Sequence, residues 1–371
     1  MKENKTLPVI LITGCSGLIG SSLSHALTDK YQVVGLDIKK PLNFPQQASW
    51  FKCDLTSDDS VTDVLAKVRE QFGHFLTSVV HLAAFYDFSG KPNELYNELT
   101  VQGTRRLTDA LRLWNVEQFI FSSSLLVMEP VEQVGEQLTE RSDVLAEWDY
   151  PRSKLEAEKV LADKTLPFST VILRIAGVYN EKCNSLPISE HIRRILEKDF
   201  ESYFFPGDPD HGQPFVHLDD LVACIANTVA NRDKLSRKEL FLIAEPETLS
   251  HRELQTEIGR LIHGEAWPTI RIPKSVAKVG AWVKDQLTSE EQFIKPWMID
   301  LADDHYAVKI RAANDSLDWK PQHRLKDTLP QIIKDLRANP KAWYRRHDLS
   351  WPDEDLGSLI ENPDTETHTS L

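Results

Sequence analysis

The amino-acid sequence predicts an α/β fold: a doubly wound parallel sheet with a smaller C-terminal lobe. In the first half, short apolar runs rich in β-branched residues alternate with stretches whose apolar residues recur at helical spacing. This alternation is typical of parallel sheets whose crossover helices cover both faces. After residue 179 the alternation loosens, and residues 180–213 are rich in Pro, Asp and Gly. We therefore expect shorter elements beside the sheet in the second part of the chain.

The first elements are expected within residues 7–72. Residues 7–13 form an apolar run that ends at a glycine-rich turn, and residues 17–29 follow it with a helical pattern. Residues 31–37 and 49–53 are two further apolar runs, which we interpret as strands. A second helix is predicted by a stripe of apolar residues at helical spacing: Val61, Leu65, Val68 and Phe72.

The same alternation continues to residue 174. Strands are expected at residues 77–82, 116–122 and 168–174. Helices are expected between them, at about residues 92–114 and 150–164. The first of these helices is predicted by apolar residues that share one face: Leu95, Leu99, Leu107, Leu111 and Trp114.

These elements divide the chain into three parts. Residues 1–179 hold most of the sheet, and residues 180–345 form a smaller lobe that is interleaved with it. The lobe is expected to cover the carboxyl ends of the strands, where ligands bind in such folds. Residues 346–371 become acidic, without Lys or Arg from Pro352 onward, which predicts a disordered tail. The amphipathic segment 275–287 is expected to be a core-facing or lid helix, and the alternative is a helix on a membrane surface.

Composition excludes several classes of function. The 371-residue chain has a net charge of −13, which argues against nucleic-acid binding. A mean hydropathy of −0.35, without a long apolar stretch or signal peptide, argues against a membrane span. The four cysteines form no C-x-x-C pair, so we expect no disulfide framework and a cytoplasmic protein. Asp208, Asp210 and His211 lie in a Pro- and Gly-rich turn, and no metal site is expected.

Three glycines at three-residue intervals lie between the first strand and the first helix. Here the chain must turn sharply and present backbone N–H groups at a helix N-terminus, where a pyrophosphate can bind. Asp37 ends the next strand, where a carboxylate accepts hydrogen bonds from a ribose diol and repels a ribose phosphate. The pattern is that of a Rossmann dinucleotide site and favours NAD over NADP. The turn residues expected to contact the cofactor are Gly14, Ser16, Gly17, Leu18, Ile19 and Gly20.

A candidate catalytic group follows the fifth strand. Tyr150 and Lys154 stand four residues apart at the start of a helix, so both side chains project from one face. A nearby ammonium favours tyrosinate, so we expect Lys154 to lower the pKa of Tyr150 and make it a usable acid or base. Ser124 could donate a hydrogen bond to the same substrate oxygen. Such a Tyr–Lys pair alone is usually a solvated helix face, and the glycine turn is what favours catalysis.

Further motifs occur in a characteristic order across most of residues 7–340. They are Cys53-Asp54-Leu55, His81-Leu82-Ala83-Ala84, Gly103-Thr104, Phe121-Ser122-Ser123-Ser124, Leu173-Arg174, Gly177-Val178-Tyr179, Phe215-Val216-His217-Leu218-Asp219-Asp220 and Leu317-Asp318-Trp319-Lys320-Pro321. With the glycine turn and the Tyr–Lys pair, they make the chain resemble the extended short-chain dehydrogenase/reductase family, also called the NAD-dependent epimerase/dehydratase group.

The resemblance implies a role for each matching residue. Tyr150 would be the general acid/base, Lys154 would bind the nicotinamide ribose, and Ser124 would orient the reacting oxygen. Asp219 would be the N-cap of a helix in the second lobe. A homodimer is implied through the helix that ends at Trp114 and the helix that bears Tyr150. Further contacts to the dinucleotide are implied for Asp54, Leu55, Ala83 and Ala84.

Departures from the family pattern narrow the substrate. Leu125 and Leu126 stand where sugar-nucleotide dehydratases have an acid pair, and leucine cannot transfer a proton. Gln213 stands where sugar-nucleotide epimerases place a diphosphate-binding arginine. The family has a second such arginine, and the corresponding stretch of this chain, residues 295–299, contains only one basic residue, Lys295. Thr100, where the family often has Asn, is expected to weaken the support of the backbone near the site. An apolar pocket is expected, although ordinary core packing is equally open for the residues that could line it: Leu125, Leu126, Met128, Phe293, Trp297 and Met298. Substrate contacts are expected from Leu125, Leu126, Gln213, Trp297 and Met298.

These observations predict an NAD-dependent oxidoreductase that interconverts a secondary alcohol and a carbonyl on a relatively apolar, non-nucleotide small molecule. One alternative is an NAD-dependent sugar-nucleotide epimerase, in which the cofactor is regenerated within each turnover. An alternative of another class is a non-catalytic scaffold that senses NAD. The presence of both Tyr150 and Lys154 disfavours the scaffold.

Overall fold

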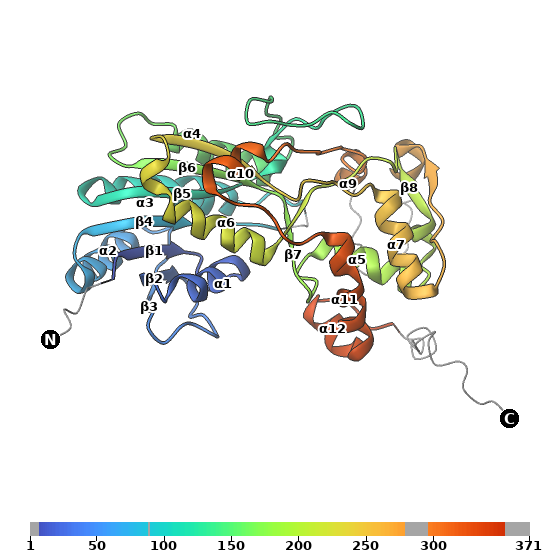
Figure 1. Cartoon of the computed structure of the whole chain (residues 1–371), viewed down its shortest axis with the longest axis horizontal. Coiled ribbons are helices and arrows are strands. Elements are labelled where there is room, and N and C mark those ends of the chain that lie inside the picture. The colour runs from blue at the N-terminus through green and yellow to red at the C-terminus, as the bar shows by residue number, and fades with distance from the viewer. Residues whose placement is uncertain (1–6, 88–89, 279–295, 353–371) are drawn as a thin grey trace.

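The computed structural model describes residues 7–87, 90–278 and 296–352. At its centre is a seven-stranded sheet with the strand order β10-β6-β5-β4-β1-β2-β3, in which every neighbouring pair is parallel (Figure 1). The predicted doubly wound α/β fold is confirmed. The strands are β1 (Val9–Thr13), β2 (Gln32–Asp37), β3 (Ser49–Lys52), β4 (Phe75–His81), β5 (Asn115–Ser124), β6 (Ser169–Ile175) and β10 (Lys238–Ile243).

The strand order reverses between β1 and β4. From β1 the chain moves outward to β2 and β3, and then returns to place β4 on the other side of β1. Thr13, the last residue of β1, pairs with Leu36 on one side and with His81 on the other. The loops that leave β1 and β4 therefore separate at their carboxyl ends, which is where doubly wound sheets bind ligands.

Helices bury both faces of this sheet. In β1, Ile10 and Ile12 belong to one apolar cluster and Leu11 to another, because successive side chains point to opposite faces. This explains why the strand reads as a continuous apolar run. The first cluster is covered by α1 (Leu18–Leu27), α6 (Leu218–Ala230) and α10 (Arg311–Leu317), and the second by α2 (Asp58–Phe72), α3 (Gly103–Ala110) and α4 (Asp149–Leu161).

A third apolar cluster forms the smaller lobe. Its helices are α5 (Leu186–Leu196), α7 (His251–His263), α11 (Leu325–Ala338) and α12 (Pro340–Arg346). Two short parallel pairs and one short helix complete this part of the chain: β7 (Gly177–Tyr179) with β9 (Phe215–His217), β8 (Phe204–Pro206) with β11 (Ile270–Ile272), and α9 (Pro296–Asp300). The chain enters this lobe after β6, returns through α6 to add β10 to the central sheet, and enters the lobe again (Figure 1).

Local sequence sets where two of these helices begin and end. The Ser57 hydroxyl accepts a hydrogen bond from a first-turn N–H of α2, and Gly73 ends that helix at a φ of +82°. Before α7, Ser250 and Glu253 form a capping box, in which each side chain accepts a hydrogen bond from the other's backbone N–H. Gly264 ends α7 in the left-handed conformation that glycine adopts without strain.

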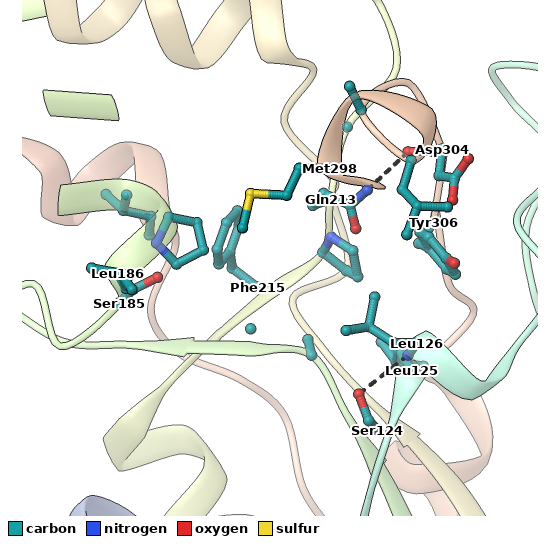
Figure 2. Close-up of a pocket in the computed structure, with 18 of the residues that line it drawn as sticks. Ser124, Leu125, Leu126, Ser185, Leu186, Gln213, Phe215, Met298, Asp304 and Tyr306 are labelled. Atoms are coloured by element: carbon teal, nitrogen blue, oxygen red, sulfur yellow. Dashed lines mark hydrogen bonds between the residues drawn. The ribbon is translucent and has the colours of Figure 1, made fainter. Parts of the chain in front are cut away.

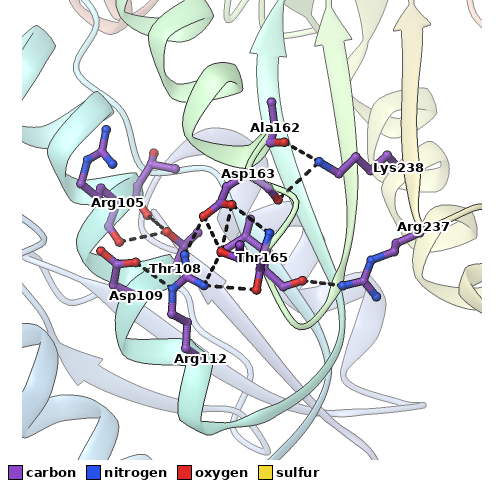
Figure 3. Close-up of polar contacts among 11 residues, drawn as sticks. Arg105, Thr108, Asp109, Arg112, Ala162, Asp163, Thr165, Arg237 and Lys238 are labelled. Carbon is purple, nitrogen blue, oxygen red and sulfur yellow. Dashed lines mark hydrogen bonds and ion pairs between the residues drawn. The ribbon is translucent and has the colours of Figure 1, made fainter.

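A polar network connects the amino ends of β6 and β10 to Asp109 and Arg112, at the end of α3 and in the turn after it (Figure 3). The Asp163 carboxylate accepts hydrogen bonds from the Thr165 N–H at 2.8 Å and from the Arg112 guanidinium at 2.8 Å. These contacts lower the pKa of the Asp163 carboxyl to about 2. Arg112 also donates to Asp109 at 3.0 Å, and Lys238, the first residue of β10, donates to the Asp163 carbonyl at 3.3 Å. The network lies at the end of the sheet opposite the carboxyl ends of the strands.

Three predicted segments differ from the structure or lie partly outside the described residues. The helix expected at residues 92–114 is a π-helix, η1 (Tyr96–Gln102), followed by α3 and a short 3₁₀ turn at Leu111–Leu113. At the junction of η1 and α3, a Cβ on Gly103 would lie 3.3 Å from the Leu55 side chain. The helix expected at residues 275–287 lies mostly outside the described residues, and so do residues 353–371 of the tail predicted at residues 346–371. Residues 346–352 of that tail are described, and Arg346 is the last residue of α12. Among the helices that are described, none has both the length and the apolar character to cross a membrane.

Candidate active site

The turn after β1 brings backbone from several segments into close contact. Gly14 has a φ of +71°, and a Cβ there would lie 2.9 Å from the Ala83 nitrogen. A Cβ on Gly20 would lie 2.2 Å from the Gly14 carbonyl oxygen, so only glycine lets α1 approach β1 this closely. Gly17 is the N-cap of α1 and provides no side-chain cap, so the first N–H groups of the helix are available to an anion. The cradle has the form that a dinucleotide pyrophosphate requires.

Asp37 lies beside this turn at the end of β2. Its carboxylate accepts hydrogen bonds from the Ser16 N–H at 3.0 Å and from the Lys39 N–H at 3.2 Å. These two contacts hold the carboxylate next to the glycine turn, where the sequence predicts recognition of a ribose diol. Leu18 and Ile19 begin α1: Leu18 is exposed, and Ile19 lines the cavity described below.

The residues expected near the adenine and along the dinucleotide occupy two loops. Asp54 follows β3, and its Oδ1 atom accepts hydrogen bonds from the Thr56 N–H at 2.9 Å and hydroxyl at 2.7 Å. This carboxylate therefore shapes the loop, while Leu55 is buried beside it. Ala83 and Ala84 follow β4 at the point where the strand order reverses, and Ala84 lines the cavity.

A chain of hydrogen bonds through His81 connects the ends of β1 and β4. The sequence alone assigned no role to His81. The Thr13 hydroxyl accepts the Ala83 N–H at 3.2 Å and lies 2.7 Å from His81 Nδ1, to which it donates. His81 Nε2 lies 3.0 Å from the Thr104 hydroxyl, which in turn donates to the Thr100 carbonyl at 2.6 Å. The ring is therefore the neutral tautomer with its proton on Nε2. Burial lowers the pKa of His81 to about 3, which keeps this arrangement constant at any physiological pH.

Thr100 also supports the backbone that follows β4. Its hydroxyl accepts a hydrogen bond from the Phe85 N–H at 3.1 Å. The expectation that threonine would weaken the support at this position is wrong, because the hydroxyl oxygen reaches a backbone amide as an amide side chain would.

The three predicted catalytic residues lie together at the carboxyl end of β5. Lys154 on α4 is buried and donates to the Ser122 carbonyl at 2.6 Å. Ser124 ends β5, and its hydroxyl accepts the Leu126 N–H at 3.2 Å (Figure 2). A hydrogen bond from Ser124 lowers the pKa of Tyr150, so the serine and the phenol act on each other directly. Ser124, Tyr150 and Lys154 all line one cavity.

Burial, and not the lysine charge, dominates the ionisation of this group. Burial raises the pKa of Tyr150 to about 12, although the Ser124 hydrogen bond opposes it. Burial also lowers the pKa of Lys154 to about 7, against the attraction of Glu158. The Lys154 ammonium lies 5.9 Å from the centre of the Tyr150 ring. The expected lowering of the Tyr150 pKa by Lys154 is therefore wrong for the protein without ligand, because removal of both groups from water outweighs their interaction.

A buried ion pair holds the helix that carries Tyr150 and Lys154. Glu158, one turn beyond Lys154, accepts two hydrogen bonds from Arg174 on β6, at 2.8 and 3.1 Å. The Ser123 hydroxyl donates to the same carboxylate at 2.5 Å. Loss of one partner would leave the other charged and buried, which is why such pairs fix the position of an element. Sequence reasoning noted Arg174 as part of a motif but assigned it no role.

A cavity of about 710 Å³ extends from the catalytic group toward the smaller lobe (Figure 2). The Gln213 amide lies on its wall and donates to the Asp304 carbonyl at 3.0 Å. Trp297 packs against Trp148 in a tilted arrangement with 4.7 Å between ring centroids, and the Trp148 ring centroid lies 5.5 Å from that of Tyr150. The residues expected to contact the substrate all line this cavity: Leu125, Leu126, Gln213, Trp297 and Met298. Met128, also expected at an apolar pocket, is instead buried in the core and does not line this cavity. Phe293 and Lys295 lie outside the described residues.

His217, and not Asp219, is the N-cap of α6. The helix begins at Leu218, and His217 Nδ1 accepts the Asp219 N–H at 3.2 Å. Asp219 lies in the first turn, where a negative charge is favoured by the helix dipole. Ligand atoms of His217, Asp219 and His323 lie within 4.8 Å of one another. Because His217 Nδ1 is an acceptor, the neutral ring has its proton on Nε2, 3.4 Å from Glu181, and offers no lone pair to a cation there.

Comparison with known proteins identifies relatives over most of the chain. Residues 10–244 match the model of the NAD dependent epimerase/dehydratase family. UDP-glucose 4-epimerase of Vibrio cholerae is 25% identical over 347 residues, covering 91% of this chain and 98% of that protein. Short-chain dehydrogenase/reductase family 42E member 1 of Danio rerio is 26% identical over 312 residues, covering 77% of this chain and 76% of that protein.

The fold is also shared with solved structures. A UDP-glucose 4-epimerase of Thermus thermophilus, in complex with NAD, superposes with a TM-score of 0.67 at 20% identity, covering 89% of this chain and 99% of that one. This likeness concerns the fold, whereas the family match rests on sequence over well over half of the chain. The chain belongs to the NAD-dependent epimerase/dehydratase family and is an NAD-dependent enzyme of the extended short-chain type.

Proposed function

We propose that this chain is an epimerase that inverts a secondary hydroxyl of a sugar carried on a nucleotide or another diphosphate. The family match and the near-complete coverage of the Vibrio cholerae epimerase support this proposal over net oxidation. The structural observation that carries it is the convergence of Ser124, Tyr150 and Lys154 at one end of a cavity of about 710 Å³. Such a cavity can take a substrate with a sizeable group beyond its reacting carbon.

The glycine turn fits NAD on physical grounds. Cβ atoms on Gly14 and Gly20 would collide with neighbouring backbone, and the first N–H groups of α1 are available to a pyrophosphate. Asp37 would hold the adenosine ribose diol, and Lys154 would hold the nicotinamide ribose. NAD bound here supplies a hydride acceptor that can return the hydride to the same carbon.

In this mechanism Tyr150 moves the proton. Its phenolate oxygen takes the hydroxyl proton of the substrate as the C–H hydride leaves, so that the carbinol becomes a ketone. Ser124 donates a hydrogen bond to the same oxygen and orients it. Positive charge at Lys154 favours the phenolate, which burial alone disfavours. The hydride chemistry in both directions would be supplied by NAD, and Tyr150 would return its proton to the substrate oxygen in the second half of the inversion.

A second candidate is net oxidation of an apolar secondary alcohol. It is favoured by Gln213, which stands in place of the expected arginine and whose amide already donates to the Asp304 carbonyl. Leu125 and Leu126 add apolar surface beside the catalytic group. In this case the ketone would leave as product and reduced cofactor would accumulate.

Product analysis with the Tyr150→Phe variant as control tests both candidates. Wild-type protein with NAD and UDP-glucose or UDP-galactose should form the epimer without accumulating NADH, as measured by product chromatography and NADH absorbance. The phenylalanine variant should lose about 10²- to 10⁴-fold in turnover, because it lacks the proton-transfer group, while it binds NAD with nearly unchanged affinity. The matched serine variant, Ser124→Ala, should reduce turnover by a smaller factor.

Three outcomes would contradict the proposal. Stoichiometric NADH with an apolar alcohol, and none of the epimer, would favour net oxidation. Full activity of the Tyr150→Phe variant would exclude the assigned mechanism. Tight NAD binding without turnover of sugar nucleotides or a broad alcohol panel would favour the non-catalytic scaffold.

A further inference from the structure

A guanidinium without an ion pair lies on the cavity wall contributed by the smaller lobe. Arg194 is on α5, and its Nε–H donates to the Glu190 carbonyl at 3.3 Å, which is its side chain's one hydrogen bond among the described residues. Glu190 and Glu201 attract its charge, but no described carboxylate forms an ion pair with it. Burial outweighs this attraction and lowers the pKa of Arg194. A charge taken from water without a partner is costly, so it indicates a ligand.

The neighbouring residue shows that this arrangement is specific to one side of α5. Arg193 is not among the residues that line the cavity, and it pairs with Glu190 at 3.0 Å and with Glu197 at 2.5 Å. The two arginines are adjacent in sequence, yet Arg193 has three ion pairs, the third with Asp199 at 3.9 Å, whereas Arg194 has none with a described residue and lines the cavity. The negative charge of Glu190 on α5 is therefore paired with Arg193, and the positive charge of Arg194 has no counterpart on this helix.

Two histidines and a glutamine complete this end of the cavity. The amide nitrogen of Gln255 donates to the Pro268 carbonyl at 2.6 Å and to the Thr269 hydroxyl at 3.0 Å. Its oxygen must then face the histidines, where it accepts from His191 Nε2 at 3.2 Å and from His251 Nε2 at 3.1 Å. The two rings stack with 4.7 Å between their centroids. These contacts connect the three side chains to one another without a ligand.

This bracing decides what the histidines can offer. With Nε2 protonated in both rings, each neutral imidazole presents a lone pair on Nδ1, and neither Nδ1 has a hydrogen-bond partner in the described part of the chain. His191 has an exposed fraction of only 6%, and both histidines line the cavity. The site thus combines one cationic donor with two neutral acceptors. A matching ligand is an oxyanion that carries O–H groups beside it.

Among the described residues that line the cavity, few side chains carry a positive charge. Lys154 and Arg194 are the lysine and arginine side chains among the described residues that line it. Lys154 belongs to the catalytic group, and Gln213 is neutral and bonded to the Asp304 carbonyl. An anionic group of the substrate would therefore be drawn toward Arg194.

We propose that Arg194, with His191, His251 and Gln255, forms a subsite that binds a hydroxyl-bearing oxyanion at the non-reacting end of the substrate. This inference rests on the proposed function for its substrate, but the subsite itself is defined by the smaller lobe. Position 213 is a glutamine, where an anion-binding arginine was expected. In this proposal the anion is recognised by a different element, α5. A phosphate of a sugar nucleotide and a carboxylate of a sugar acid share the required chemistry.

Binding to the full-length protein with saturating NAD tests the subsite. Calorimetric titrations would use UDP-glucose, inorganic phosphate, glucuronate and neutral glucose as probes. Arg194→Met should weaken binding of the three anionic probes by about tenfold or more, because it removes a charge-assisted contact. Arg193→Met removes the same charge from the same helix and should leave their affinities nearly unchanged. Arg194→Lys should retain part of the affinity and keeps the test decisive if the methionine variant fails to fold.

The possible outcomes separate this subsite from the proposed reaction. Equal binding of the anions by wild type and the Arg194→Met variant would overturn the subsite, as would anion binding no tighter than that of glucose. Phosphate that does not compete with UDP-glucose would also overturn it, because the anion would then bind elsewhere. Loss of binding in the Arg194 variant without epimerisation by the wild type would support the subsite and reject the proposed function. Undiminished epimerisation by the Arg194→Met variant would support the proposed function and overturn the subsite.

Discussion

At the scale of single residues, the environment of each side chain decides its charge more than its sequence neighbours do. Tyr150 and Lys154 stand four residues apart, and that spacing predicts a phenol activated by an ammonium. In the structure both groups are removed from water, which raises the pKa of one to about 12 and lowers that of the other to about 7. Asp37, in contrast, lies partly exposed at a strand end and is held by two backbone N–H groups. It is a preformed acceptor for a ribose diol.

The role of Asp37 gives a prediction at this scale. Asp37→Ala should weaken NAD binding by about tenfold, because it removes a charged hydrogen-bond acceptor, and should weaken NADP binding less. Fluorescence titration with both cofactors measures the two affinities. Asp59→Ala, on the exposed surface of α2, removes the same charge and serves as the control. Equal losses for NAD and NADP would contradict the assigned role.

At the scale of elements, short polar contacts join segments that are distant in the chain. The His81 chain joins β1, β4, η1 and α3. Glu245, just after β10, accepts the Leu325 N–H at the start of α11 at 3.0 Å and so ties the sheet to the lobe. Burial raises the pKa of Glu245 to about 7, so this carboxyl group keeps its proton under mildly acidic conditions.

Glu245 makes the stability of the protein depend on pH. Between about pH 4.5 and pH 7 the unfolded chain releases the Glu245 proton while the folded chain keeps it, so this residue reduces stability as the pH rises. Glu245→Gln cannot ionise and should gain up to about 3 kcal/mol relative to wild type at pH 8, and nothing at pH 4. Urea unfolding at both pH values measures the difference. Glu239→Gln, nearer the surface of β10, is the control, and a gain that is equal at the two pH values would refute the linkage.

Elements read from periodicity and glycine spacing were predicted well, and those that depend on tertiary contacts were not. The runs at residues 7–13 and 31–37 correspond to β1 and β2, since both faces of these strands are buried and their apolar character is local. The glycine turn was also predictable from the sequence, because the three positions that carry glycine lie within one short segment. Strand β10 was not predicted, although it contains the apolar run Leu240-Phe241-Leu242-Ile243, because it follows the part of the chain in which the regular alternation of strands and helices loosens. Arg194 and His251 lie far apart in sequence, and only the packing of α5 against α7 brings them to one cavity.

At the scale of the whole molecule, the sheet and the lobe cannot be separated by one cut in the chain. The outermost strand, β10, comes from residues 238–243, after the chain has already passed through the lobe. Helices α6 and α10 cover one face of the sheet and also follow β6 in sequence. The predicted part at residues 1–179 therefore contains six of these seven strands, but of the three helices that cover one face it contains only α1.

This arrangement predicts how fragments behave. A fragment of residues 1–179 should lack cooperative thermal unfolding and should bind a hydrophobic dye, because the face normally covered by α6 and α10 is exposed. A fragment of residues 1–320 keeps β10, α6 and α10 and should retain more near-ultraviolet circular dichroism per residue. Cooperative unfolding of the shorter fragment, with NAD binding, would show that it folds independently and contradict this expectation.

The position of β10 also has a consequence during synthesis. Roughly sixty residues separate the end of β6 from the start of β10, and a ribosome needs roughly 3 to 12 s to add that many. For this interval the nascent chain presents the open edge of β6, an apolar strand with unpaired backbone groups, to its surroundings. The yield of folded protein in a cell should therefore depend on translation speed and on chaperones that shield a strand edge near the ribosome.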